Sequence, residues 1–354
     1  MKFSYLAMTA YQGPAPGIEV WPASPLYCKA EVARQSVAQS LDMAQYAEQL
    51  GFDWVSVAEH HYAPYMMTPN PVVMASALSQ VVKKARIALL GPLVPLNNPI
   101  RLAEEVAMLD NLSDGRVVVL FLRGTPNEHN TYDTPKEDTR GMTQEGIDLI
   151  LKAWAEDEPF SWQGDYYNFS TVSVWPRLQQ YPHPPMYGSG NSEESVVYAA
   201  KRGFGIAFSF APPEVVRDWV QLYHKECAKA GWQPGPEQVL YRGLCHIAAS
   251  DQAAEDDLER HFGAQATEQA ALQSKTMGGP PKVPLVAKPY FLGSPETVVE
   301  RMKVMADCGV GVVDLCFSVG DLNQQRNAMA LVAEKVMPVV RGWEQDKGEV
   351  KARA

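Results

Sequence analysis

Short apolar runs alternate along the chain with longer stretches in which apolar residues recur at helical spacing. Residues 117–122 are apolar at every position, which indicates a strand buried on both faces. Strands of this kind, separated by crossover helices, are typical of a parallel sheet, and eight of them favour a closed barrel. The predicted strands cover residues 2–7, 54–59, 87–91, 117–122, 185–188, 206–210, 240–248 and 312–317.

The intervening stretches carry helix signals. Apolar residues at helical spacing predict a helix over residues 32–50, and Gly51 suits the left-handed conformation that often follows a helix. The next predicted helix ends in Lys83 and Lys84, where cations favour the helix dipole. A third helix is predicted over residues 99–109. The pattern predicts an α/β fold, a (β/α)₈ TIM barrel with insertions, as one domain over residues 1–344, followed by a flexible charged tail at 345–354.

Two segments of the chain are additional to what a minimal (β/α)₈ barrel requires. Residues 125–140 are polar and follow the fourth strand, where barrel enzymes place substrate loops. Residues 263–287 are longer and lack strong periodicity. Each segment suits a surface insertion as well as an active-site loop, and we expect the second to act as a lid.

Composition narrows the class of ligand. The net charge of -10 disfavours nucleic acid and anionic membranes as partners, and no apolar run approaches the roughly 18 residues of a membrane span. Five cysteines without CxxC spacing argue against a disulfide framework and a zinc site. The N-terminus lacks the pattern of a secretory signal. We expect a cytoplasmic protein that acts on a small molecule and binds no metal.

A glutamate, two histidines and a tyrosine end the second predicted strand at residues 59–62. Strand alternation places His60 toward the barrel mouth and Glu59 on the valine face that packs against helices. An imidazole there suits proton exchange, although a pair of hydrogen-bonded structural histidines fits the same pattern. Residues 62–67, beginning with Tyr62, suit either an apolar substrate pocket or simple packing.

Two further motifs are suited to binding an anion. Arg123 and Gly124 end the fourth strand, where a guanidinium can hold a phosphate or take part in a structural ion pair. The fifth strand leads into a loop with free amides and hydroxyls before a helix, which suits a phosphate or plain helix capping. The residues of this loop that we single out are Gly190, Asn191, Ser192 and Ser195. Leu90 and Gly91 end the third strand, either in an ordinary turn or beside a bound ring.

These motifs occur together in the order typical of one family. From the first strand to about Arg341, the chain resembles the bacterial luciferase-like flavin monooxygenases. The resemblance rests on the Glu-His-His-aromatic run, the Arg-Gly pair, the glycine and serine loop, and the segments 109–116, 293–296 and 336–338.

The resemblance implies an enzyme that uses reduced FMN and O₂, through a flavin hydroperoxide, to oxidise a small organic substrate. By position, it implies that His60 assists the chemistry and that Arg123 and the loop of Asn191, Ser192 and Ser195 hold the flavin phosphate. It also implies a cis peptide near Leu90–Gly91 and places Phe210 close to the flavin ring.

The resemblance has departures and leaves alternatives. Leu122 stands where luciferase has a reactive cysteine before the arginine, and Asn191 replaces an acidic residue, which removes a like charge from the anion site. Light emission is not implied. The alternatives are a deazaflavin-dependent hydride-transfer oxidoreductase and a non-catalytic flavin-binding protein. Reduced FMN would come from a separate NAD(P)H:flavin reductase or be formed at this site, and a homodimer is expected.

Overall fold

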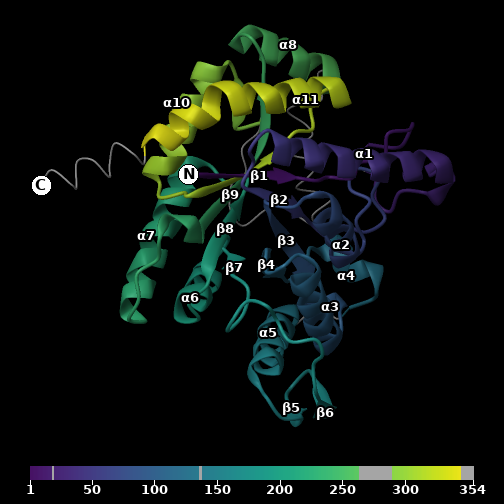
Figure 1. The fold of residues 1–354 in the computed structure, drawn as a ribbon, viewed down its shortest axis with the longest axis vertical. Helices are drawn as coiled ribbons and strands as arrows, with labels where there is room; N and C mark the ends of the chain where they lie inside the picture. Colours follow the sequence, from purple (N-terminus) through teal and green to yellow (C-terminus); the bar gives the residue numbers. More distant parts are fainter. Residues whose placement is uncertain (18–19, 135–137, 263–288, 344–354) are drawn as a thin grey trace, which may run out of the picture.

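The computed structural model describes residues 1–17, 20–134, 138–262 and 289–343. Within them, eight parallel strands form a closed barrel surrounded by helices (Figure 1). Each strand pairs with the next, and β8 closes the ring by pairing with β9. In chain order the barrel strands are β1 (Lys2–Leu6), β2 (Trp54–Val57), β3 (Arg86–Leu93), β4 (Val117–Leu122), β7 (Met186–Ser189), β8 (Gly205–Ser209), β9 (Val239–Ile247) and β11 (Val312–Cys316).

All eight predicted strands are present, so the predicted barrel is confirmed. Their outward side chains pack against the helices in the main core, to which Val55, Ile87 and Val119 belong. A second apolar cluster fills the interior of the barrel from the first residues of some strands up to the cavity described below. This cluster consists of Trp54, Ala88, Leu90, Val118, Leu120, Tyr187, Ala207, Leu240 and Val312. The interior of the barrel is therefore packed at its amino end.

The helices cover the outside of the barrel. They are α1 (Ala30–Gln49), α2 (Pro71–Val81), α3 (Pro99–Leu112), α5 (Thr139–Ala155), α6 (Glu193–Lys201), α7 (Pro213–Lys229), α8 (Asp251–Phe262), α10 (Pro295–Asp307) and α11 (Leu322–Leu331). Short 3-10 turns occur at Pro25–Tyr27, Val94–Leu96 and Pro236–Gln238, and a π-helical segment, Val332–Val336, follows α11. No described helix is long and apolar enough to cross a membrane.

Helix ends agree with the predictions only in part. Gly51 follows α1 with a φ of 88°, as expected. α2 stops at Val81, before the two lysines, because the backbone N–H groups of Lys83 and Lys84 donate to the Glu48 carboxylate instead of continuing the helix. α3 runs to Leu112, three residues beyond the predicted end at 109.

Some elements were not predicted. A two-stranded hairpin, β5 (Phe160–Gln163) and β6 (Asn168–Val172), lies apart from the barrel (Figure 1). The short strand β10 (Phe291–Gly293) pairs with β9. The first predicted insertion contains the six-residue helix α4 (Pro126–Thr131). The second, at 263–287, and the tail at 345–354 lie outside the described residues.

Candidate active site

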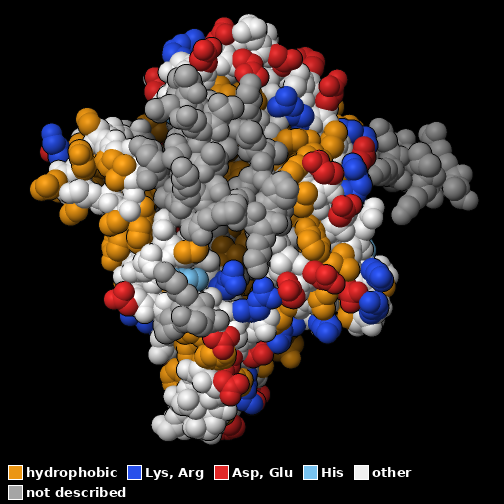
Figure 2. Space-filling view, turned by 180° about the vertical axis from the view of Figure 1, so that it is seen from behind, with side chains coloured by type: hydrophobic (Ala, Val, Ile, Leu, Met, Phe, Trp, Pro, Cys, Tyr) orange, Lys and Arg blue, Asp and Glu red, His pale blue; other side chains and the backbone are white. Residues whose placement is uncertain are grey.

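A cavity of about 1050 Å³ opens at the carboxyl ends of the barrel strands. Its lining draws on residues as far apart in the chain as Leu6 and Phe317. Active sites of (β/α)₈ barrels lie at this end, and the volume is close to the upper limit of the range of about 300–1000 Å³ found for small-molecule pockets. Figure 2 shows hydrophobic side chains within a hollow and a histidine and basic side chains at its edge.

Most residues singled out in the sequence meet at this cavity. Its lining includes His60, Leu90, Gly91, Arg123, Asn191, Ser192, Ser195 and Phe210. Gly190 sits between two lining residues without lining the cavity itself. Tyr62 does not line it: the residue is 52% exposed and its ring centroid lies 5.9 Å from that of Trp21.

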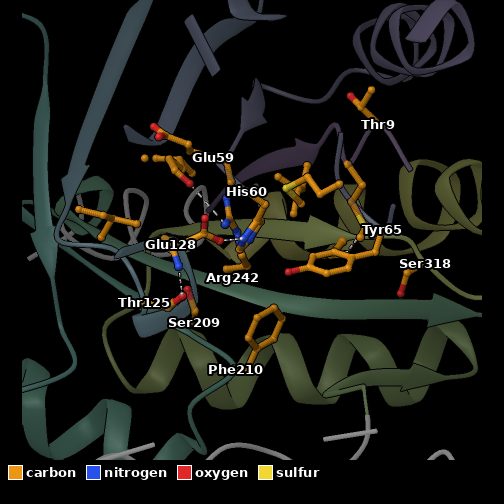
Figure 3. A pocket seen from close by; sticks show the side chains of 18 of the residues that line it. Thr9, Glu59, His60, Tyr65, Thr125, Glu128, Ser209, Phe210, Arg242 and Ser318 are labelled. Atoms are coloured by element: carbon orange, nitrogen blue, oxygen red, sulfur yellow. Dashed lines mark hydrogen bonds and ion pairs between the residues drawn. The ribbon is translucent and has the colours of Figure 1, made fainter. Parts of the chain in front are cut away.

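His60 is held by a glutamate from another loop. Its Nδ1 lies 2.9 Å from Oε1 of Glu128, and both residues line the cavity (Figure 3). Glu128 belongs to α4, where Thr125 caps the helix, and its side chain is 4% exposed. A carboxylate at Nδ1 fixes the proton on that nitrogen, so Nε2 is the atom left to exchange a proton. Among the described residues, Nε2 has no hydrogen-bond partner.

His61 forms a different pair. Its Nε2 lies 3.0 Å from Oε1 of Glu59, whose other oxygen accepts the backbone N–H of Leu93 at 3.0 Å. Glu59 was predicted on the helix-facing side, and this was wrong, because β2 ends at Val57 and strand alternation stops there. Glu59 lines the cavity, whereas His61 is buried outside its lining. The two histidines thus have separate carboxylate partners.

Tyr65 packs edge-on against the His60 ring, with ring centroids 5.4 Å apart. Burial, together with the nearby Glu128 carboxylate, raises the pKa of Tyr65 to about 12. Its hydroxyl therefore stays protonated at neutral pH and can donate a hydrogen bond into the cavity that it lines.

Another set of lining residues is suited to an anion. Ser192 caps α6 by accepting the backbone N–H of Ser195 at 3.3 Å, and its hydroxyl contacts that of Ser195 at 3.0 Å. Arg123 and Asn191 line the same cavity, as does Arg140, whose guanidinium also lies 3.4 Å from Glu194. Guanidinium groups, hydroxyls and a helix N-terminus are groups that can bind a phosphate.

Three functional candidates escaped the sequence analysis. Glu128 and Arg140 both fall in the segment 125–140, which suited either a surface insertion or an active-site loop. Its position after the fourth strand was therefore the only signal for these two residues. Tyr65 fell in the predicted apolar stretch. The structure describes no group of three or more His, Cys, Asp or Glu side chains arranged to hold a metal ion.

The third strand ends in an unusual backbone. The peptide between Leu90 and Gly91 is cis, as the resemblance implied, and both residues line the cavity. A Cβ at Gly91 would lie 2.1 Å from the carbonyl oxygen of Leu120, so only glycine fits. Phe210, which directly follows β8, has a φ of 57° and donates its backbone N–H to the carbonyl oxygen of Arg242.

Comparison with known proteins agrees with this geometry. The family model described as luciferase-like monooxygenase matches residues 1–311. The chain is 26% identical over 204 residues to an alkanal monooxygenase beta chain of Photorhabdus luminescens, covering 56% of this chain and 62% of that protein. It is 22% identical over 330 residues to the oxygenase component of the flavin-dependent trigonelline monooxygenase of Acinetobacter baylyi, covering 87% of this chain and 91% of that protein.

A solved structure extends the match to nearly the whole chain. The monooxygenase RslO1 of Streptomyces bottropensis superposes with a TM-score of 0.79 at 26% identity, covering 96% of this chain and 99% of that one. The family model covers most of the barrel, and the motifs that line the cavity lie within it. The chain belongs to the luciferase-like monooxygenase family.

Proposed function

We propose that this protein is an FMN-dependent monooxygenase that uses reduced FMN and O₂ to oxidise a small organic substrate. The observation that carries the proposal is one cavity with an imidazole–carboxylate pair in one part of its lining and an anion site in another. The relatives named as monooxygenases, one of them flavin-dependent, support it. When bound, reduced FMN supplies the electrons for oxygen activation, which no side chain here can supply.

The cavity lining fits FMN. Arg123, Arg140, Asn191 and the two serines Ser192 and Ser195 would hold the phosphate, since all are hydrogen-bond donors and two are cations. Leu90, Gly91 and Phe210 would contact the ring system of the flavin. Gly190 would let the backbone of the phosphate-binding loop pack closely against β8, because a Cβ at this position would lie 2.5 Å from the Phe208 ring.

The chain's own residues would bind and orient the reactants and would transfer protons. His60 exchanges a proton at Nε2 while Glu128 holds Nδ1, and Tyr65 donates a hydrogen bond beside it. Apolar side chains exclude water from the same space. These are Leu6, Met8, Met43, Met66, Leu244 and Phe317. A substrate with an apolar body is expected, and Tyr62 stays a proposed substrate contact at the outer rim.

The proposed use of reduced FMN implies a protein partner that supplies it. One relative is named as an oxygenase component, which supports a separate flavin reductase as the source of reduced FMN here. We also propose a cytoplasmic location and a homodimer.

The test begins with anaerobic titration of the purified protein with reduced FMN and, separately, with a reduced deazaflavin. The loaded protein is then mixed with ¹⁸O₂ and a panel of organic substrates. We expect preferential binding of reduced FMN and ¹⁸O in a product. Preference for the deazaflavin, with hydride transfer and no oxygen incorporation, would identify the alternative oxidoreductase. FMN binding without product across the panel would identify a non-catalytic flavin-binding protein.

A further inference from the structure

Four polar side chains lie together inside the barrel, next to the apolar cluster that fills its interior. These are Ser4, Ser56, Arg242 and Asp314, from four different strands. Ser56, Arg242 and Asp314 each follow by two positions an inward-facing member of the apolar cluster, namely Trp54, Leu240 and Val312. Alternate residues of a strand share a face, so these side chains also point into the barrel, two residues nearer the carboxyl ends of their strands.

Asp314 organises these four side chains. Its side chain is fully buried, and Oδ1 accepts hydrogen bonds from the hydroxyls of Ser4 at 2.6 Å and Ser56 at 2.7 Å. Its Oδ2 accepts Nε of Arg242 at 2.7 Å. Three strands therefore fix the orientation of one arginine, since an aspartate with both oxygens engaged has little freedom to move.

The guanidinium retains donors that no described residue satisfies. Within the described part of the chain, Nη2 of Arg242 is buried without a hydrogen-bond partner, and Nη1 reaches only the carbonyl oxygen of Leu90, at 3.5 Å. A buried donor without an acceptor is unfavourable, and arginine can only donate. Arg242 lines the cavity, and Leu90 and Gly91 line it too.

We propose that Arg242 is an oxygen-binding site in the cavity floor, which donates to a carbonyl or carboxylate oxygen of the bound molecule. Because Asp314 balances the charge, a neutral carbonyl is accepted as well as an anion. The oxygen belongs either to the pyrimidine ring of the flavin or to the organic substrate. The inference deepens the proposed function and rests on it for the identity of the flavin.

The test removes both charges together, because Arg242→Met alone leaves Asp314 buried and unpaired. In R242M/D314N, the asparagine oxygen still accepts from the two serines. The matched control, R341M/D53N, removes a guanidinium–carboxylate pair of 2.9 Å at the amino end of the strands. Thermal unfolding checks that each variant is folded. Should R242M/D314N not fold, Arg242→Lys keeps the charge and removes the two-pronged donor.

Two binding measurements distinguish the sources of the oxygen. FMN affinity is measured by fluorescence titration, and octanoate affinity by calorimetry on the flavin-free protein, with 1-octanol as the comparison that lacks a carboxylate. We expect at least one affinity to fall by about tenfold or more in the Arg242 variant and not in the control. A loss for FMN identifies a flavin oxygen, and a loss for octanoate identifies a substrate oxygen.

Unchanged affinities in both measurements, or a wild-type protein that binds neither probe, overturn the inference. Failure of the proposed cofactor is seen separately, as absence of FMN binding by the wild type and the control alike. The octanoate measurement then still decides the role of Arg242, because it uses protein without flavin.

Discussion

Oε1 of Glu128 lies 2.9 Å from Nδ1 of His60, and the other oxygen of the same carboxylate is buried and has no partner among the described residues. The two residues come from different loops of the barrel, 68 positions apart. A ring held in this way keeps one tautomer and one orientation, so the carboxylate is a positioning group for the imidazole.

Replacing Glu128 should slow the chemistry without weakening cofactor binding. Glu128→Gln keeps the shape and removes the charge, and we expect reoxidation of bound reduced FMN by O₂ to slow about tenfold. Glu128→Leu removes the acceptor as well, and about 100-fold is expected. Stopped-flow absorbance measures both rates. The affinity for FMN should stay at the wild-type value. Glu105→Gln, on the outer helix α3, is the matched control. Wild-type rates in Glu128→Leu would exclude the positioning role of Glu128.

Arg123 and Arg140 should distinguish FMN from riboflavin, which lacks the phosphate. Arg123→Met and Arg140→Met are each expected to weaken FMN binding by about 10- to 100-fold and to leave riboflavin binding unchanged. Fluorescence titration with both flavins measures the difference. Arg202→Met is the control, since Arg202 pairs with Asp148 at the other end of α6. Equal losses for the two flavins would place the phosphate elsewhere.

Gly91 should tolerate no side chain. A Cβ there would meet the Leu120 carbonyl at 2.1 Å and the Leu122 side chain at 2.9 Å. Gly91→Ala should therefore lower the free energy of unfolding by about 1–3 kcal/mol, as overpacking does. Gly342→Ala should not destabilise the protein, because no described atom beyond its chain neighbours and its own helix backbone lies within 4 Å of the new Cβ. Urea denaturation of both variants checks the contrast, and equal midpoints would contradict it.

Glu48 should contribute stability that disappears in acid. Its carboxylate accepts the backbone N–H groups of Lys83, Lys84 and Ala85. Partial burial raises its pKa, but these hydrogen bonds outweigh that effect and lower the pKa overall. A lowered folded-state pKa gives stability that is present above the unfolded value of about 4.3 and is lost as pH falls through the folded value.

Glu48→Gln tests this linkage. The variant should be less stable than the wild type at pH 7, and the difference should shrink as the pH is lowered below about 4. Thermal unfolding across this pH range measures it. A stability difference that is constant with pH would show that the charge of Glu48 has no part in holding the segment before β3.

The barrel was predictable because the strands are short and apolar on both faces, as in residues 117–122. The cavity-lining residues at strand ends were predictable for a related reason. Parallel strands of a barrel bring their carboxyl ends to one rim, and His60 and Arg123 line the same cavity there. The hairpin of β5 and β6 was missed because its residues are mostly exposed or half-buried and form no strong apolar run.

Contacts between side chains could not be predicted in the same way. Strand alternation fails at Glu59 because β2 ends two residues earlier. Tyr62 has a φ of 54°, a left-handed turn that a single sequence does not reveal, and its ring lies on Trp21. The pairing of Arg242 with Asp314 joins strands 72 positions apart, and periodicity indicates only that both face inward.

The helix that carries Glu128 is six residues long and belongs to a connection, not to the barrel wall. Loops change more readily than the scaffold that carries them. The group that orients His60 can therefore be exchanged while every strand stays the same. Transplanting residues 125–131 between related barrels would move this carboxylate as a unit, which makes the segment a natural place to retune reactivity without rebuilding the fold.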